Sequence, residues 1–470
     1  MSFWTRRKPL DAHLRVAQEH QLKKSLNWLH LMGLGVGAVI GTGIYTLTGI
    51  GAERAGPAMI IAFAACGLLC TCAALAYAEL ATMIPAAGSA YTYSYSVLGE
   101  VVAWVVGWSL VLEYTVSMAA VAAGWSGYMV GLLRSLGVDV PDAIALGPHA
   151  GGLVNLPAVL IVLAVTALLA RGAKESASVS IVLVFIKLLA LGLFIALTIV
   201  AFKSEHFAPF MPYGFSSHVE DGGHVRGVMA AAAIVFFAFF GFDAVSTSAE
   251  ETVNPKRDLT IGILGSMALA TLIYMAVAAC AVGAWPYQEF AVSNEPLAFI
   301  LRSLGHPLAA FIIGAAAIIA LPSVILTMIY GQTRVFFVMA RDGMMPKSMC
   351  KLSGERKSPV RLVYSVGLFI AACAGFFRLD EIAELSNAGT LLAFISVSVC
   401  VLVLRVSKPD MKRDFRCPLV WIVAPAAILG CLYFMFSLPV ATMVRFAIWN
   451  AAGFVIYLAY GRRQSELKTA

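Results

Sequence analysis

Twelve long apolar segments set what this chain can fold into. A helix needs about 20 mainly apolar residues to cross the hydrocarbon core of a bilayer. Runs of about that length cover residues 28–50, 57–80, 97–133, 153–170, 178–202, 226–250, 259–283, 307–340, 360–377, 387–405, 419–438 and 442–460. Their hydrophobicity is continuous rather than alternating, which is typical of helices and not of a transmembrane β-barrel. The sequence therefore predicts an all-α polytopic membrane protein with twelve transmembrane helices.

The bulk composition agrees with that prediction. Hydrophobic residues make up 60% of the chain and charged residues only 13%, which excludes an ordinary soluble domain and a disordered chain. The nine cysteines are an odd number, and most lie within apolar segments, where they act as small buried hydrophobes. No separate soluble domain is long enough to carry the net charge of +7.

The basic residues lie mostly on one side of the predicted membrane. Of 33 Lys and Arg residues, 24 fall before the first span, after the last or in loops on that same side, and seven fall on the other. This asymmetry predicts that both termini are cytoplasmic, and it explains the positive net charge without nucleic acid. Residues 1–27 then form a cytoplasmic N-terminal tail that lacks the apolar stretch of a signal peptide, and residues 462–470 form a cytoplasmic C-terminal tail.

Two of the predicted spans are interrupted at membrane depth. The first contains five glycines between residues 33 and 43, and the sixth contains Gly241 followed by Asp243. Gly41 and Gly241 occupy corresponding places in two five-span halves, which is typical of inverted-repeat transporters with a substrate site at the midplane. Amides freed at such a break attract a carboxylate and freed carbonyls attract an ammonium, which suits a zwitterion. Close helix packing through small residues remains an alternative for the first span.

Ionisable groups within a bilayer are costly and are therefore functional candidates. Lys187 lies about 12 Å into the fifth span at 1.5 Å per residue, where it could exchange a proton or instead snorkel or sit in a static pair. Glu113, in the third span, could take part directly, bond a neighbouring helix break or stay protonated. Asp243 could cap the second half-helix or hold a gate. Glu79 falls near the cytoplasmic end of its span, where we expect water to reach it.

No pattern of catalytic residues competes with these features. The chain has no metalloprotease histidine pair, no phosphate-binding loop and no paired CxxC motif, and its histidines lie in tails, loops or span edges. We therefore expect no enzyme activity, no catalytic residue, no metal site and no cofactor.

Four parts of the chain carry a family resemblance: residues 21–26 with 35–45, 239–258, 331–343 and 387–394. They resemble signature segments of the amino acid–polyamine–organocation superfamily, and within it the bacterial relatives of the cationic amino acid transporters. The resemblance implies a leucine-transporter-type 5+5 inverted repeat with discontinuous helices 1 and 6. The transport domain would cover residues 28–461, with repeats at 28–202 and 226–405 and two extra helices at 419–460. Leu259 and Thr260 stand where relatives usually carry a proline.

The resemblance also implies roles for individual residues. Backbone amides at Thr42 and Gly43 would hold the substrate carboxylate. Carbonyl groups that would receive the substrate ammonium belong to Val39, Ile40, Phe237, Ala238 and Phe240. Lys187 matches a lysine that replaces a sodium ion in proton-coupled members, and Glu113 matches an acid near the pocket. Residues 323–328 of the eighth span would face the substrate side chain.

These observations predict a secondary active amino acid transporter of a bacterial inner membrane. We expect proton-coupled symport into the cell by alternating access, with an amino acid and protons as ligands. An exchanger or a polyamine or cationic amino acid permease of the same fold remains an alternative, as does a receptor or channel-like membrane protein. The sequence leaves open which amino acids are carried, the oligomeric state and any accessory subunit.

Overall fold

The computed structural model describes residues 6–9, 26–86, 88–170, 176–220, 224–249, 252–293, 295–350 and 360–465. Most of the predicted N-terminal tail and residues 466–470 of the C-terminal tail lie outside the described residues. Most of the described chain is helical, and its one small sheet pairs β1 (His218–Val219) with β2 (Val225–Arg226).

The helices follow the predicted apolar segments closely. In chain order the longer ones are α2 (Trp28–Val39), α4 (Leu47–Ala55), α5 (Met59–Met83), α6 (Ser89–Val97), α7 (Glu100–Ser135), α9 (Leu156–Ala170), α10 (Ser176–Val200), α11 (Val228–Val235), α13 (Pro255–Ala284), α15 (Pro296–Ser303), α16 (Pro307–Arg341), α17 (Val360–Phe376), α18 (Leu379–Ser407), α19 (Val420–Phe436) and α20 (Val440–Ile456). Shorter helices are α3 (Thr42–Tyr45), α8 (Asp142–Ala145), α12 (Ala244–Thr247), α14 (Tyr287–Phe290) and α21 (Arg462–Gln464).

Eight helical segments of the described chain are long and apolar enough to cross a membrane. They are Leu47–Met83, Glu100–Ser135, Val182–Val200, Val228–Thr247, Pro255–Ala284, Pro307–Arg341, Glu381–Ser407 and Val440–Gln464. Four shorter apolar helices, α2, α9, α17 and α19, accompany them. The prediction of an all-α polytopic membrane protein is therefore confirmed, whereas the count of twelve crossings and the inverted repeat stay predictions.

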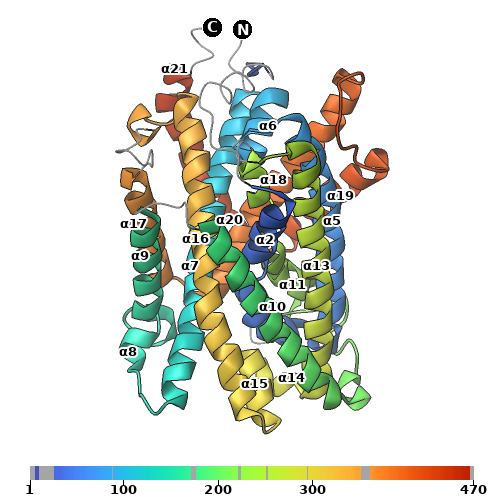
Figure 1. The fold of residues 1–470 in the computed structure, drawn as a ribbon, viewed down its shortest axis with the longest axis vertical. Helices are drawn as coiled ribbons and strands as arrows, with labels where there is room; N and C mark the ends of the chain where they lie inside the picture. The colour runs from blue at the N-terminus through green and yellow to red at the C-terminus, as the bar shows by residue number, and fades with distance from the viewer. Residues whose placement is uncertain are drawn as a thin grey trace.

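The interrupted sixth segment lies at the centre of the bundle. Residues 228–247 are buried throughout, whereas much of α10 and α20 faces outward. The long helix α7 packs along α16 and α18, and α13 packs along α2 and α5. Figure 1 shows α6 and α21 at one end of the molecule and α8, α14 and α15 at the other. The two interrupted segments are thus enclosed by long, continuous helices.

A stack of tryptophans joins α20 to α7. The indole of Trp108 donates to the carbonyl of Trp449 at 2.9 Å, and the indole of Trp449 donates back to the carbonyl of Trp108 at 3.0 Å. Their ring centroids lie 4.8 Å apart, and Trp104 stacks on the other face of Trp108. Trp104 in turn donates to the carbonyl of Gly453. Reciprocal hydrogen bonds and stacking therefore hold α20 against α7.

A buried ion cluster closes the end of the bundle that carries α6 and α21. The Glu79 carboxylate accepts hydrogen bonds from Arg405, Arg413 and the backbone amide of Cys417. The side chains of Glu79 and Arg413 are each only 1% exposed. Our expectation that water reaches Glu79 is therefore wrong, because Arg405 at the end of α18 and Arg413 in the α18–α19 connection cover this carboxylate and neutralise its charge.

Replacing Glu79 by alanine should lower the thermal unfolding midpoint of the purified protein markedly. The substitution leaves two largely buried guanidinium groups without their carboxylate partner, and breaking a buried ion pair in this way costs about 3–5 kcal/mol. The matched control is Glu381→Ala, which removes the exposed partner of Arg445 and should cost at most about 1 kcal/mol. Equal shifts of the midpoint in the two variants, measured in the same detergent, would contradict the structural role given to Glu79.

Candidate functional site

The first apolar segment breaks between α2 and α3. Helix α2 ends at Val39, Ile40 and Gly41 adopt extended backbone conformations, and α3 starts at Thr42. A helix that ends here leaves its last carbonyl groups without intrahelical donors, and a helix that starts here leaves its first amides without acceptors. The break therefore presents carbonyls from one side and amides from the other at the same depth.

The second break interrupts the central segment. Helix α11 passes into a 3₁₀ turn at Phe236–Phe239, and Phe240 is extended before Gly241 and α12. Gly241 has a φ of 106°, a conformation that favours glycine. A Cβ atom at this position would also lie 2.6 Å from Cε of Met328 and 3.1 Å from Cβ of Ala38. Backbone conformation and close packing both require a glycine here.

The two breaks lie against each other. A Cβ atom added to Gly43 would lie 2.3 Å from Cα of Ala238, so the two backbones are in direct contact. The hydroxyl of Tyr274, from α13, lies within hydrogen-bond distance of the carbonyl of Val39 at 2.6 Å and that of Ala238 at 3.0 Å. The structure thus brings together and buries all the break and binding residues expected from the sequence: Val39, Ile40, Gly41, Thr42, Gly43, Phe237, Ala238, Phe240 and Gly241.

Sequence reasoning missed Tyr274. The only signal is a hydroxyl within a long apolar helix, and nothing in the pattern of that helix indicates which neighbour it meets. In the structure this side chain is fully buried, and its hydroxyl has one hydrogen to share between two carbonyl groups from different breaks. Tyr274 therefore links a carbonyl group of the first break to a carbonyl group of the second.

Apolar side chains complete the wall of this site. A Cβ atom at Gly41 would lie 3.3 Å from Val324, and Met328 lies against Gly241, so one face of α16 touches both breaks. This is the segment 323–328 that we expected beside the substrate. The rings of Phe237 and Phe240 pack with centroids 4.6 Å apart. The site therefore combines backbone polar groups with an apolar lining.

Lys187 reaches the carbonyl end of α2. Its Nζ donates to the carbonyl of Gly37 at 2.9 Å, and the side chain is fully buried, so it does not snorkel. Val184, on the same helix, packs closely against the Gly37 backbone. Among the residues that the structure describes, no acidic side chain forms an ion pair with Lys187. A cation at a helix C-terminus is favourable because it satisfies orphan carbonyls and opposes the helix dipole.

The two acids predicted within the membrane, Asp243 and Glu113, are both buried. Asp243 directly precedes α12, yet its side chain does not cap that helix; it accepts a hydrogen bond from the hydroxyl of Tyr114 at 2.9 Å. Glu113 packs against Gly389 of α18 and is 1% exposed. Neither of its carboxylate oxygens has a hydrogen-bond partner among the described residues. Asp243 and Glu113 are therefore both buried acids within the bundle, at 2% and 1% exposure.

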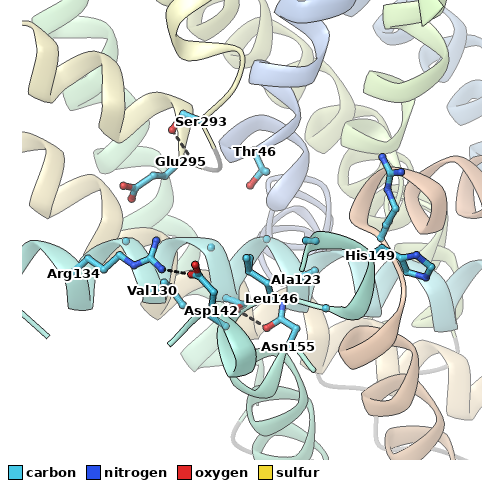
Figure 2. Close-up of a pocket in the computed structure, with 18 of the residues that line it drawn as sticks. Thr46, Ala123, Val130, Arg134, Asp142, Leu146, His149, Asn155, Ser293 and Glu295 are labelled. Atoms are coloured by element: carbon cyan, nitrogen blue, oxygen red, sulfur yellow. Dashed lines mark hydrogen bonds and ion pairs between the residues drawn. The ribbon is translucent and has the colours of Figure 1, made fainter. Parts of the chain in front are cut away.

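A cavity of about 820 Å³ opens at the end of the molecule that carries α8 and α15. Figure 2 shows Thr46 at one side of it and the ion pair between Arg134 and Asp142 at another. Glu295 lines the cavity and pairs with Arg302. Burial raises the pKa of Glu295 above its ordinary value, and the charge of Arg302 opposes that rise. Sequence patterns could not indicate this cavity, because its walls come from five separate parts of the chain.

Buried breaks in two neighbouring membrane helices are typical of membrane transporters. Comparison with known proteins agrees. The model of the amino acid permease family matches residues 26–460, and the chain belongs to this family of the amino acid–polyamine–organocation superfamily.

Three relatives illustrate the range of the family. The chain is 44% identical to the branched-chain amino acid permease BcaP of Bacillus subtilis over 96% of this chain and 95% of that protein. It is 41% identical to the methylthioribose transporter of the same organism over 99% of this chain and the whole of that protein. It is 36% identical to the vacuolar cationic amino acid transporter 4 of Arabidopsis thaliana over 87% of this chain and 68% of that protein.

Replacing Gly241 by alanine should abolish transport. The left-handed conformation alone costs an ordinary residue about 1–2 kcal/mol, and the new methyl group would press on Met328 and Ala38. The matched control is Gly192→Ala on α10, where an added Cβ meets nothing within 4 Å. Uptake into vesicles and the unfolding midpoint should both stay close to wild type for the control, and wild-type uptake by Gly241→Ala would contradict the assignment.

Proposed function

We propose that this protein is a secondary active transporter that carries amino acids into the cell across the inner (plasma) membrane together with protons. It works by alternating access, with twelve membrane crossings, a 5+5 inverted repeat and both termini in the cytoplasm. The observation that carries the proposal is the fully buried Lys187 bound to the carbonyl of Gly37, at the end of an interrupted helix. A lone buried amine in this position is suited to gain and lose a proton.

The substrate zwitterion would bridge the two breaks. Its carboxylate binds the free amides at Thr42 and Gly43, and its ammonium binds carbonyls of Val39, Ile40, Phe237, Ala238 and Phe240. Each carbonyl oxygen has two lone pairs, so the bond from Tyr274 to Val39 or Ala238 leaves capacity for a second donor. Tyr274 therefore holds these carbonyls in place in the absence of substrate.

Coupling would arise because the proton on Lys187 and the packing of α2 depend on each other. A charged Lys187 binds the Gly37 carbonyl more strongly than a neutral one, since hydrogen bonds to charged groups contribute about 1.5–3 kcal/mol. The same charge is costly in a dry interior without an anionic partner. A conformation that admits water to Lys187 therefore favours the protonated amine, and one that moves α2 away releases the proton.

The two ends of the bundle differ in a way that supports an outward-facing conformation. At the end near α6 and α21, Lys8 forms an ion pair of 2.6 Å with Asp342, which also accepts a hydrogen bond from Tyr91. The backbone amide of Glu100 donates to the carbonyl of Arg6. The N-terminal segment thus ties α6, α7 and α16 together on the proposed cytoplasmic side, whereas the large cavity opens on the other side.

The lining of the site favours neutral amino acids with apolar side chains. Val324, Met328 and the pair of phenylalanines supply an apolar surface, and the name of the Bacillus subtilis relative BcaP specifies branched-chain amino acids. Methylthioribose and cationic amino acids, named for the other relatives, are the appropriate competitors in a test of specificity.

Uptake of labelled compounds into sodium-free proteoliposomes tests the proposal directly. We expect leucine, isoleucine and valine to accumulate only when an inward proton gradient is imposed. Uptake that occurs solely into vesicles preloaded with amino acid would identify an exchanger and contradict symport. Uptake of methylthioribose without any amino acid would contradict the proposed substrate class.

Substitution of Lys187 by methionine should abolish accumulation driven by the proton gradient. Methionine keeps much of the side-chain volume but carries no proton, whereas the substrate contacts at the breaks remain. We expect at least about a tenfold loss of gradient-driven uptake, given the strength of a hydrogen bond to a charged group, with substrate-induced thermal stabilisation retained. Lys256→Met, at an exposed lysine paired with Asp414, is the control. Unchanged gradient-driven accumulation by Lys187→Met would refute its role in coupling.

A further inference from the structure

The cavity of about 820 Å³ lies on the outer side in the proposed orientation, and we call it the outer cavity. It leads from the surface toward the first break along a row of glycines on α7. Gly124, Gly127 and Gly131 all line it. A Cβ atom at Gly124 would lie 2.2 Å from Cγ2 of Thr42, and a Cβ atom at Gly131 would lie 2.6 Å from the Glu295 carboxylate. Seven residues of helix span about 10 Å. Glu295 therefore stands about two helical turns outside the break, on the same face of α7.

Glu295 is the better buried of the two acids in this cavity. Its side chain is 14% exposed, against 66% for Asp142. Its partner Arg302 is more exposed than Glu295, at 39%. The carboxylate is thus more deeply buried than the guanidinium, and the pair presents one charge of each sign across a short distance.

A second observation shows that the cavity is equipped for a polar ligand. The hydroxyl of Thr46 has no hydrogen-bond partner among the described residues, although this residue is only 5% exposed. Thr46 lines the cavity just beyond α3, and Figure 2 shows this residue on the opposite side of the cavity from Asp142. A buried hydroxyl without a partner is costly, and a polar ligand in the cavity would remove that cost.

We propose that the outer cavity is a first binding site for the amino acid, in which the substrate separates Glu295 from Arg302. The α-ammonium of the substrate binds the Glu295 carboxylate, and the substrate carboxylate binds the Arg302 guanidinium. Thr46 contacts the substrate at the inner end of the cavity. This site accepts amino acids with neutral or cationic side chains and disfavours acidic ones, because a second carboxylate would face Glu295. The inference rests on the proposed function and adds a recognition step before the central site.

Substitution of Glu295 by glutamine tests this step. Glutamine keeps the size of the side chain and its packing on Gly131 but loses the charge that binds an ammonium. We expect the KM for substrate entering from the outer face to rise about tenfold or more, with the maximal rate and the KM from the cytoplasmic face unchanged. Gly131→Ala, which keeps every charge but displaces the carboxylate, should raise the outer KM in the same direction.

The measurement uses exchange of the labelled amino acid that the wild type carries best, in right-side-out and inside-out membrane vesicles without a proton gradient. Asp142→Asn is the matched control, since it removes a cavity carboxylate that is exposed and paired, and its outer KM should change less than about twofold. An unchanged outer KM in Glu295→Gln would overturn the inference, as would equal changes at both faces or an equal change in Asp142→Asn. A wild-type protein that exchanges no amino acid would instead overturn the proposed function, and this inference with it.

Discussion

The structure depends on how unpaired backbone groups are satisfied inside a membrane. Each carbonyl or amide without a partner in hydrocarbon costs several kcal/mol, so a helix can break there only if other groups replace the lost bonds. Here two side chains donate hydrogen bonds to the carbonyl end of α2: Lys187 to the carbonyl of Gly37 and Tyr274 to that of Val39. Neither is a local cap; each comes from a different helix. The orientation of α10 and α13 around α2 is therefore constrained by the hydrogen bonds that these helices donate to the interrupted backbone.

The contact between the two breaks and the buried Lys187 lie apart in space. The amides and carbonyls that suit a zwitterion lie at Gly41 and Gly241, where the two breaks touch. Lys187 acts one turn earlier, on a carbonyl that belongs to α2 itself. Under the proposed symport, a proton at Lys187 would change the position of α2 without contacting the substrate.

Much of the fold and part of the site could be predicted from the sequence because the signals are local. Length and continuity of apolar runs predict helices, and glycine with a following aspartate in an apolar run predicts a break. The family resemblance placed residues 323–328 beside the substrate side chain, and the contact of Val324 and Met328 with the two breaks was not itself predicted. The bonds of Tyr274, the pairing of Asp243 with Tyr114 and the arginines on Glu79 could not be predicted, because each joins helices far apart in the chain. Their partners depend on the rotation of each helix about its own axis, which an almost uniformly apolar sequence hardly restricts.

The tryptophan stack between α7 and α20 has a consequence for biosynthesis. Trp108 and Trp449 are 341 residues apart, and a ribosome adds roughly 5–20 residues per second. Helix α7 is therefore made roughly 20–70 s before α20, its last neighbour in the chain. During that time the indole groups of α7 lack the carbonyl partners that α20 supplies, and the bundle is completed only after nearly the whole chain has been synthesised.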